Sequence, residues 1–254
     1  MNKKGVSACV FSAKGGVGKT TNLLNLAGII SQLDKKVLIV DFDLYTGVVA
    51  KYLNRAFDRN IYNLTDDFSN KRYERLDHYT ISYNDHISIL SAPKDPRYAN
   101  KIDIRYIKDI ISMACLEYDV VLIDTNHALD ACNLRILELV DEILFMTTGD
   151  PLDLSNMKSL ITIFDSLKFD NYKIVLNNSR DPYKTYLGSF ELKKILGHHI
   201  DYELSSDMFL KDMDRFVMEG KIMSLDTAFP NVMTNDYQVF VAMAMDLLGV
   251  NRDE

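Results

Sequence analysis

Short apolar runs alternate along the chain with longer segments whose apolar residues recur at helical spacing. A continuous apolar run is typical of a buried parallel strand, whereas recurrence every three or four residues is typical of an amphipathic helix. The expected strands are 6–11, 37–40, 87–90, 120–124, 142–147, 173–176 and 200–204, and the expected helices are 20–33, 44–53, 102–116, 130–139, 152–167, 190–196, 207–218 and 235–248. This alternation predicts an α/β fold with a doubly wound, mostly parallel β-sheet and helices on both faces.

The stretch 55–83 follows neither period, and short helices and loops are expected there because it is rich in Asn, Asp, Arg and Tyr. Its tyrosines either form a recognition surface or lie half-buried with wet hydroxyl groups, and the second arrangement is the commoner one. They are Tyr62, Tyr73, Tyr79 and Tyr83. Because the sequence contains no repeat, linker or low-complexity segment, one domain over residues 1–254 is expected.

Composition and charge argue against several classes of protein. The 254 residues are 47% hydrophobic, but no apolar stretch approaches the roughly 18 residues of a membrane-spanning helix. Residues 1–11 are too short, and too interrupted by Ser7, for a signal peptide, so a cytoplasmic protein is expected. The net charge of −7 argues against binding nucleic acid through a broad basic face. Cys9, Cys115 and Cys132 lie in apolar segments and are expected to be buried thiols.

The segment Ser12 to Thr21, SAKGGVGKTT, joins the first expected strand to the first expected helix. A glycine-rich loop in this context points successive backbone N–H groups toward one site, where the helix dipole adds positive charge, so it binds phosphate. In such a loop the Lys19 ammonium can reach the β- and γ-phosphates, and the Thr20 hydroxyl can bind Mg²⁺. The residues of this loop expected to bind nucleotide are Gly15, Gly16, Val17, Gly18, Lys19, Thr20 and Thr21.

Two features separate this segment from the standard phosphate-binding loop. Ala13 stands where that loop has a glycine, and Lys14 directly precedes the glycines of KGGVGKTT. In both features the segment resembles the deviant Walker A motif of the ParA/MinD superfamily of dimeric ATPases. The resemblance implies a P-loop NTPase fold, bound ATP and Mg²⁺, and a homodimer that forms with ATP. It also implies that Lys14 reaches the phosphates bound by the other subunit and supplies charge as an arginine finger does.

Acidic residues end two of the expected strands at the carboxyl edge of the sheet, where ligands bind in open α/β folds. Asp124 ends the run VVLID and fits the Walker B role of binding Mg²⁺ directly or through water. Asp41 and Asp43 end VLIVDFD, and carboxylates so close together repel unless a cation lies between them, although turn-forming acids are the alternative. By resemblance, Asp43 orients the attacking water and Asp41 supports the Mg²⁺ shell. The expected catalytic residues are then Lys14, Lys19 and Asp43, and the expected metal site is Thr20, Asp41 and Asp124.

The nucleotide base is expected at the end of another strand. Asn177, which ends the run KIVLN, resembles the superfamily asparagine that binds adenine, and an amide offers both a donor and an acceptor to the base. Guanine-specific relatives place an acid nearby, and Asp181 in NNSRD leaves that alternative open. Asp207 in LSSD corresponds to a segment near the nucleotide in relatives, although Ser205 replaces their proline.

Further segments narrow the resemblance within the superfamily. DFDLYTGVVAKYL, SAPKDP, YDVVLIDT and MEGK are most similar to the CpaE/TadZ group, ATPases that localise pilus-secretion machinery at a cell pole. This similarity implies a protein partner in a polar or secretion assembly and recruitment to a pole. Many relatives in that group carry an N-terminal receiver-like domain, whereas here the first strand starts within ten residues of Met1. They also read DTP or DxP where this chain reads DTNHALD.

Other functions stay open on the sequence alone. A MinD-like membrane-cycling ATPase, a flagellar-number regulator and a ParA-type partition ATPase share the same motifs. MinD-type membrane binding uses a basic C-terminal helix, and the acidic, lysine-free end DYQVFVAMAMDLLGVNRDE argues against direct membrane binding. A bacterial tyrosine kinase would end in a tyrosine cluster, but only Tyr237 lies in the last thirty residues. A scaffold that binds nucleotide without hydrolysing it would not need both Lys14 and Asp43.

Overall fold

The computed structural model describes residues 4–178, 187–206 and 213–250. The eight strands of this part of the chain form one sheet in the order β3-β4-β2-β5-β1-β6-β7-β8. They are β1 (Val6–Phe11), β2 (Val37–Asp41), β3 (Ile81–Ser82), β4 (Ile87–Leu90), β5 (Val120–Asp124), β6 (Glu142–Thr147), β7 (Tyr172–Asn177) and β8 (Tyr202–Leu204). Neighbouring strands are parallel except β3 and β4, so the expected mostly parallel sheet is confirmed.

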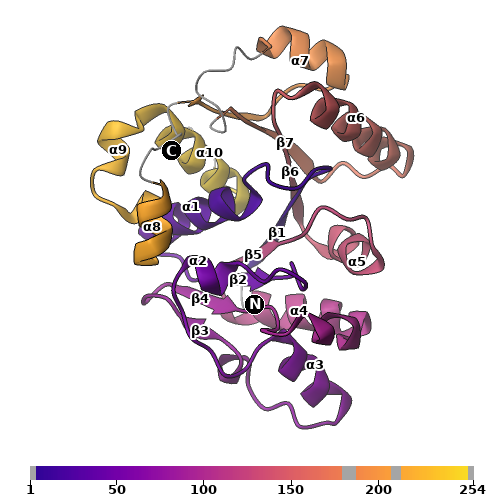
Figure 1. Ribbon diagram of the computed structural model, residues 1–254, viewed down its shortest axis with the longest axis vertical. Helices are drawn as coiled ribbons and strands as arrows, with labels where there is room; N and C mark the ends of the chain where they lie inside the picture. The colour runs from indigo at the N-terminus through magenta and orange to yellow at the C-terminus, as the bar shows by residue number, and fades with distance from the viewer. Residues whose placement is uncertain (1–3, 179–186, 207–212, 251–254) are drawn as a thin grey trace.

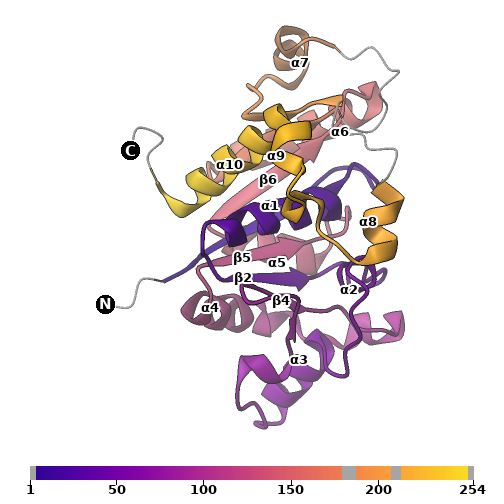
Figure 2. The same ribbon diagram turned by 90° about the vertical axis from the view of Figure 1, so that its left-hand side faces the viewer.

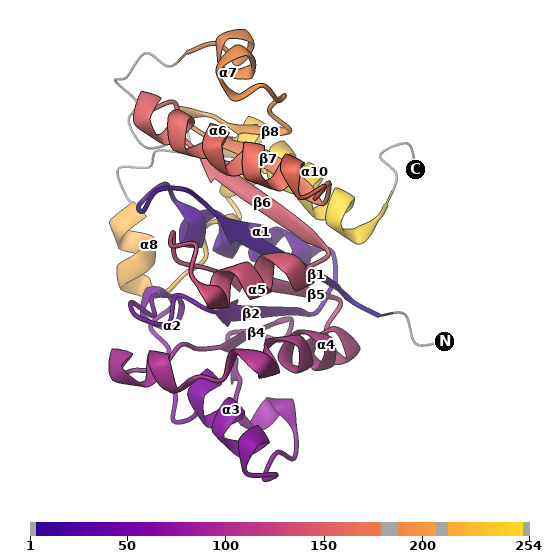
Figure 3. The same ribbon diagram turned by 90° about the vertical axis from the view of Figure 1, so that its right-hand side faces the viewer.

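Helices cover both faces of the sheet (Figure 1). One face carries α1 (Lys19–Gln32), α8 (Met213–Glu219), α9 (Phe229–Val232) and α10 (Thr234–Leu248), and α1 and α10 lie side by side in Figure 2. The other carries α4 (Ile107–Glu117), α5 (Ala131–Leu139) and α6 (Pro151–Ser166), which lie in front of the sheet in Figure 3, with α3 (Ile61–Ser69) and α7 (Ser189–Leu196) beyond them. Among the described helices, none has both the length and the hydrophobicity needed to span a bilayer.

Two apolar cores lie between the sheet and its two helical layers, one on each face of the sheet. Successive residues of a strand point to opposite faces, so Ala8 and Val10 of β1 pack toward α1 and α10, whereas Cys9 and Phe11 pack toward α4 to α6. Both Cys9 and Cys115 are buried, as expected, whereas Cys132 is half-buried. Burial raises the pKa of each of the three thiols, so all three are held in the unreactive protonated form.

Within 44–53 a helix is expected after a bend at Gly47, and the structure has that bend followed by the short helix α2, Val49–Tyr52. The backbone turns first, because the N–H groups of Thr46 and Gly47 both donate to the carbonyl of Asp43. Gly47 adopts a φ of 53°, in the left-handed region that glycine tolerates best. The segment after β2 is therefore a tight loop at the carboxyl edge of the sheet, and it holds Asp43 there.

Two other helices differ from the expectation at their starts. The expected helix 102–116 begins at Ile107, and a 3₁₀ turn, Ile104–Tyr106, precedes it because the Asp103 side chain accepts from the Arg105 N–H. The expected helix 207–218 falls partly outside the described residues, which contain its end as α8.

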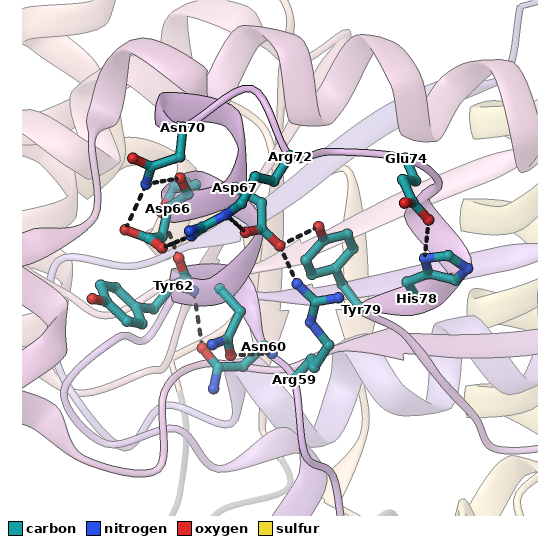
Figure 4. A network of polar contacts seen from close by, with 12 residues as sticks. Arg59, Asn60, Tyr62, Asp66, Asp67, Asn70, Arg72, Glu74, His78 and Tyr79 are labelled. Carbon is teal, nitrogen blue, oxygen red and sulfur yellow. Dashed lines mark hydrogen bonds and ion pairs between the residues drawn. The ribbon is translucent and has the colours of Figure 1, made fainter.

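The segment 55–83 is built around α3 and a buried carboxylate (Figure 4). Asp67 is 7% exposed and accepts a hydrogen bond of 2.7 Å from the Tyr79 hydroxyl and one of 2.9 Å from Arg72 Nε. Arg59 pairs with the same carboxylate and lies over the ring of Tyr79. Tyr79 is 2% exposed and stacks on Tyr73, which is partly buried against the core. These two tyrosines are therefore structural, but Tyr79 differs from the expected half-buried arrangement because it is fully buried and its hydroxyl donates to Asp67 instead of to water.

Replacing Asp67 with asparagine is expected to lower the free energy of unfolding by about 1–3 kcal/mol at neutral pH, because a buried carboxylate that accepts from Tyr79 and pairs with Arg59 and Arg72 loses its charge. The Tyr79 hydroxyl, with the Arg72 and Arg59 guanidinium groups, holds the pKa of Asp67 below its usual value. A carboxyl group with a depressed folded-state pKa stabilises the fold above its unfolded-state pKa and loses that effect as pH falls through the folded-state value. The difference in free energy of unfolding between wild type and Asp67→Asn, measured by urea unfolding, should therefore be large at pH 7 and smaller near pH 3.

The matched control is Asp66→Asn, since Asp66 pairs with the same Arg72 but its side chain is 42% exposed. An exposed ion pair is worth at most about 1 kcal/mol. Equal destabilisation by the two substitutions, or an effect of Asp67→Asn that does not change with pH, would contradict the assignment.

Candidate functional site

The glycine-rich loop, residues 12–18, connects β1 to α1 at the point where the strand order reverses, which is the usual ligand site of such sheets. Gly18 caps α1 with a φ of 97°, in the left-handed region. A Cβ atom at this position would lie 2.6 Å from Asn177 Nδ2 and 3.0 Å from Asn22 Nδ2, so both the backbone and the packing require glycine. The Asn22 amide also donates to the Gly18 carbonyl at 2.8 Å. The loop is therefore supported from behind by amide side chains.

Lys19 occupies the first position of α1 and is 9% exposed. Its Nζ donates to Ser12 Oγ at 3.0 Å, and that hydroxyl donates to the Lys14 carbonyl at 2.7 Å. Burial lowers the pKa of Lys19, and the charges of Asp124, Asp43 and Asp153 oppose this shift. A partly desolvated cation is thus held against the loop, where an anion would be attracted more strongly than at an exposed lysine.

Thr20 and Asp124 meet although 104 residues separate them in the sequence. The Thr20 hydroxyl donates to Asp124 Oδ2 at 2.6 Å. Asp124 is 1% exposed, and its other oxygen, Oδ1, is buried without a hydrogen-bond partner among the described residues. Burial raises the pKa of Asp124 to about 6, and the hydrogen bond from Thr20 opposes the rise. A buried oxygen without a donor, beside a hydroxyl group, fits a hard divalent cation such as Mg²⁺.

Asp41 and Asp43 have different surroundings in the structure. Asp41 is buried beside Asp124 in the register of β2 and β5, and it accepts the backbone N–H groups of Asp43 at 3.2 Å and Val49 at 3.1 Å. Burial, and then the charge of Asp124, raise the pKa of Asp41 well above its usual value. Asp43 instead lines the pocket beside the glycine-rich loop. Asp41 therefore holds the loop that carries Asp43, and its expected contact with Mg²⁺ stays a prediction.

This pocket has a volume of about 440 Å³ and is formed by three loops at the carboxyl edge of the sheet. The loop after β1 supplies the glycines and Lys19, the loop after β2 supplies Asp43 and Thr46, and the loop after β5 supplies Thr125, Asn126 and His127. The full lining is Gly15, Gly16, Gly18, Lys19, Thr20, Thr21, Asp43, Thr46, Thr125, Asn126 and His127. Most of the expected nucleotide-binding residues are thus brought together around one pocket.

Lys14 lies outside this lining, with its side chain 48% exposed. Its Nζ is 3.7 Å from Asp150 Oδ1. Asp150 is the residue before α6, and its carboxylate accepts the N–H groups of Leu152 and Asp153. In the single chain Lys14 therefore points to the start of α6 and not into its own pocket.

Asn177 is buried at the end of β7, and its amide donates to the Val17 carbonyl at 2.8 Å. The side chain supports the glycine-rich loop from behind and does not line the pocket, so its contact with adenine stays a prediction. Asp207, the other residue expected near the nucleotide, lies outside the described residues.

Sequence reasoning did not single out several residues that the structure places at the site. They are Ser12, Thr46, Thr125, Asn126, His127 and Asp150. A usable signal existed for some of them, because polar residues that directly follow an apolar run lie at the carboxyl edge of a parallel sheet. Thr125 to His127 follow VVLID in this way, and Thr46 follows VLIVDFD by a few residues.

Comparison with known proteins agrees with this geometry. The model of the AAA_31 family, described as an AAA domain, matches residues 6–176. The tyrosine-protein kinase YwqD of Bacillus subtilis is 31% identical over 146 residues, which cover 56% of this chain and 60% of that protein. The chain spans only 60%, 52% and 64% of the length of three curated relatives that it matches.

Two solved structures are similar over almost the whole chain. A ParA family ATPase from Chlorobium tepidum TLS has a TM-score of 0.81 at 22% identity and covers 96% of this chain and 99% of its own. The septum site-determining protein MinD of Pyrococcus horikoshii OT3, solved in complex with Mg-ADP, has a TM-score of 0.78 at 17% identity and covers 95% of each chain. The family match over residues 6–176 shows that the chain belongs to the AAA_31 family, and the two solved structures show that it shares the fold of those ParA and MinD proteins.

Proposed function

We propose that this protein binds and hydrolyses ATP and acts as a homodimeric spatial switch. One observation carries the proposal: Lys19, Asp43 and the Thr20–Asp124 pair converge on a single pocket at the carboxyl edge of the sheet. Phosphoryl transfer needs a phosphate cradle, charge neutralisation, a metal and a positioned nucleophile. The pocket supplies a candidate residue for each of these needs.

Each residue has a distinct task in this proposal. The backbone of Gly15 to Gly18 and the ammonium of Lys19 bind the phosphates, and Thr20 and Asp124 hold Mg²⁺. When bound, Mg²⁺ neutralises the charge on the β- and γ-phosphates. Asp43, carried into the pocket by the loop after β2, orients the attacking water and accepts its proton. The MinD relative was solved with Mg-ADP, which supports the assignment of nucleotide and metal to this pocket.

The exposed position of Lys14 supports the dimer. Its side chain lies outside its own pocket, paired with Asp150 across 3.7 Å of partly solvated surface. Such a pair is worth at most about 1 kcal/mol, so little free energy is lost when Lys14 leaves it. We assign Lys14 to the phosphates of the second subunit, where it supplies positive charge in trans.

For the cellular role, we propose the localisation of a pilus, secretion or other polar assembly, as the CpaE/TadZ-like segments favour. A tyrosine kinase is the second candidate, because YwqD is 31% identical over the matched region. Tyr237, in α10, packs against the core beside Phe229, so this tyrosine is not presented as a substrate.

The direct test is the mass of the wild-type protein measured by light scattering with ATP, with ADP and without nucleotide. A dimer is expected only with ATP and Mg²⁺, because only the γ-phosphate completes the contact with the second subunit. Release of phosphate should occur under the same condition. A monomer under all three conditions, with normal ATP turnover, would contradict the dimeric mechanism. The protein would then hydrolyse ATP within a single subunit, as ordinary phosphate-loop enzymes do.

A further inference from the structure

We propose that His127 contacts the terminal phosphate of the bound nucleotide and makes the pocket prefer ATP to ADP. The inference rests on the proposed function, since it assumes that the pocket binds a nucleotide. It goes beyond that function because it assigns the recognition of the third phosphate to a side chain of the DTNHALD segment that has no role in the expected site.

The imidazole of His127 packs directly on the glycine-rich loop. A Cβ atom built on Gly15 would lie 3.3 Å from Nδ1 and 3.4 Å from Cε1 of His127. Gly15 therefore leaves room for this ring, and a Cβ atom there would require the ring to shift slightly. The ring also lines the pocket that contains Lys19 and Thr20.

The loop that carries His127 is anchored on both sides. Before it, the Thr125 hydroxyl donates to the Val10 carbonyl of β1 at 2.7 Å. The Ala128 N–H, after His127, donates to Asn126 Oδ1 at 2.7 Å, and Asn133 Nδ2 donates to the same oxygen at 2.7 Å. Asn133 is 1% exposed in α5, so this second anchor is part of the core. The backbone on either side of His127 is thus held in place, and its exposed side chain lines the pocket.

The position of His127 indicates which phosphate it meets. The N-terminus of α1 and Lys19 would bind the β- and γ-phosphates, and Thr20 would hold the metal, whose charge would offset that of the phosphates. Asn177 and Val17 lie at the other side of the loop, behind Gly18. His127 packs on Gly15, three residues before the Gly18 that caps α1, and lines the same pocket as Asp43, the residue proposed to meet the water that attacks the γ-phosphorus. The third phosphate therefore has His127 on one wall of its site.

The chemistry of the side chain suits this contact. Imidazole donates one N–H when neutral and two when protonated, and a phosphate oxygen is a strong acceptor. Within the described part of the chain, the His127 ring makes no hydrogen bond or ion pair, so no existing contact has to break. ADP has no phosphate at that place and gains nothing from the donor. The contact therefore discriminates between the two nucleotides.

The experiment measures equilibrium affinities for ADP and for a non-hydrolysable ATP analogue, both with Mg²⁺. His127→Ala is expected to weaken binding of the analogue about 10-fold and to leave ADP affinity unchanged. His127→Gln, which keeps an N–H donor, is expected to recover part of the loss. The matched control is His199→Ala, because His199 is a 72% exposed histidine that pairs with Asp201 away from the pocket.

Equal losses for ADP and the analogue would show that His127 only supports the loop, and unchanged affinity for both would remove it from the site. Either result would overturn the inference while leaving the proposed function intact. If the wild type bound neither nucleotide, the proposed function would fall, and the inference with it. The thermal midpoint of each variant without nucleotide separates loss of binding from loss of folding.

Discussion

Lys19→Ala is expected to lower the affinity for ATP on the order of 100-fold, because a charge-assisted contact with the β- and γ-phosphates disappears. The side chain is held near the loop by Ser12 before any ligand arrives, so the ammonium group is already in place and little ordering is needed on binding. The same substitution removes a cation that burial disfavours, since the pKa of Lys19 is lowered by desolvation. The fold should therefore survive the loss of its charge.

Isothermal titration with ATP and Mg²⁺ measures this effect, and the thermal midpoint without nucleotide reports on the fold. Lys108→Ala is the matched control, because Lys108 is an exposed lysine of α4, outside the lining of the pocket. Wild-type affinity in Lys19→Ala would end the assignment of the glycine-rich loop to phosphate binding. A drop in the thermal midpoint by many degrees would instead give Lys19 a structural role.

The second large effect is expected in a comparison of Asp43→Ala with Lys14→Ala. This comparison separates the loss of hydrolysis from the loss of dimerisation. Both variants are expected to lose turnover, by about 10²–10⁴-fold for the general base and at least about 10³-fold for the charge supplied in trans. Asp43→Ala still has Lys19, Thr20 and Asp124, so it should bind Mg-ATP and keep the γ-phosphate. It should accumulate as a dimer that does not dissociate.

Lys14→Ala should bind ATP in its own pocket, because Lys14 does not line that pocket in the single chain. It should stay monomeric, because the contact with the partner's phosphates is missing. Light scattering with ATP distinguishes a trapped dimer from a monomer that has bound nucleotide. Two monomers, or a normal dimer of Lys14→Ala, would show that the hydrolytic site is complete within one subunit.

The trapped Asp43→Ala dimer is also the form in which a spatial switch would hold its partner. Proteins that it retains with ATP, and that Lys14→Ala does not retain, identify the assembly that the switch serves. This comparison decides between the CpaE/TadZ-like function and the partition, flagellar and membrane-cycling alternatives.

The sequence by itself determined the architecture and the centre of the site. β1, the glycine-rich loop and α1 are contiguous, so the apolar period, the glycines and Lys19 can be read within one short segment. Asp124 is similarly readable, because an acid that ends a buried parallel strand lies at the carboxyl edge of the sheet. These features depend on local hydrophobic periodicity and on the direction of the chain, and both can be read directly from the sequence.

Only the tertiary structure decided what each acid and amide faces. Asp41 and Asp43 look equivalent in VLIVDFD, but β2 ends at Asp41, which is buried by its neighbour β5, whereas Asp43 belongs to the following turn. Asn177 packs behind Val17, 160 residues away, and His127 packs on Gly15. Contacts at such separations follow from the strand order, which places β5 and β6 on either side of β1. The hydrophobic pattern of the sequence identifies each strand separately. It does not show which strands are neighbours, because parallel strands that pair are far apart in the sequence.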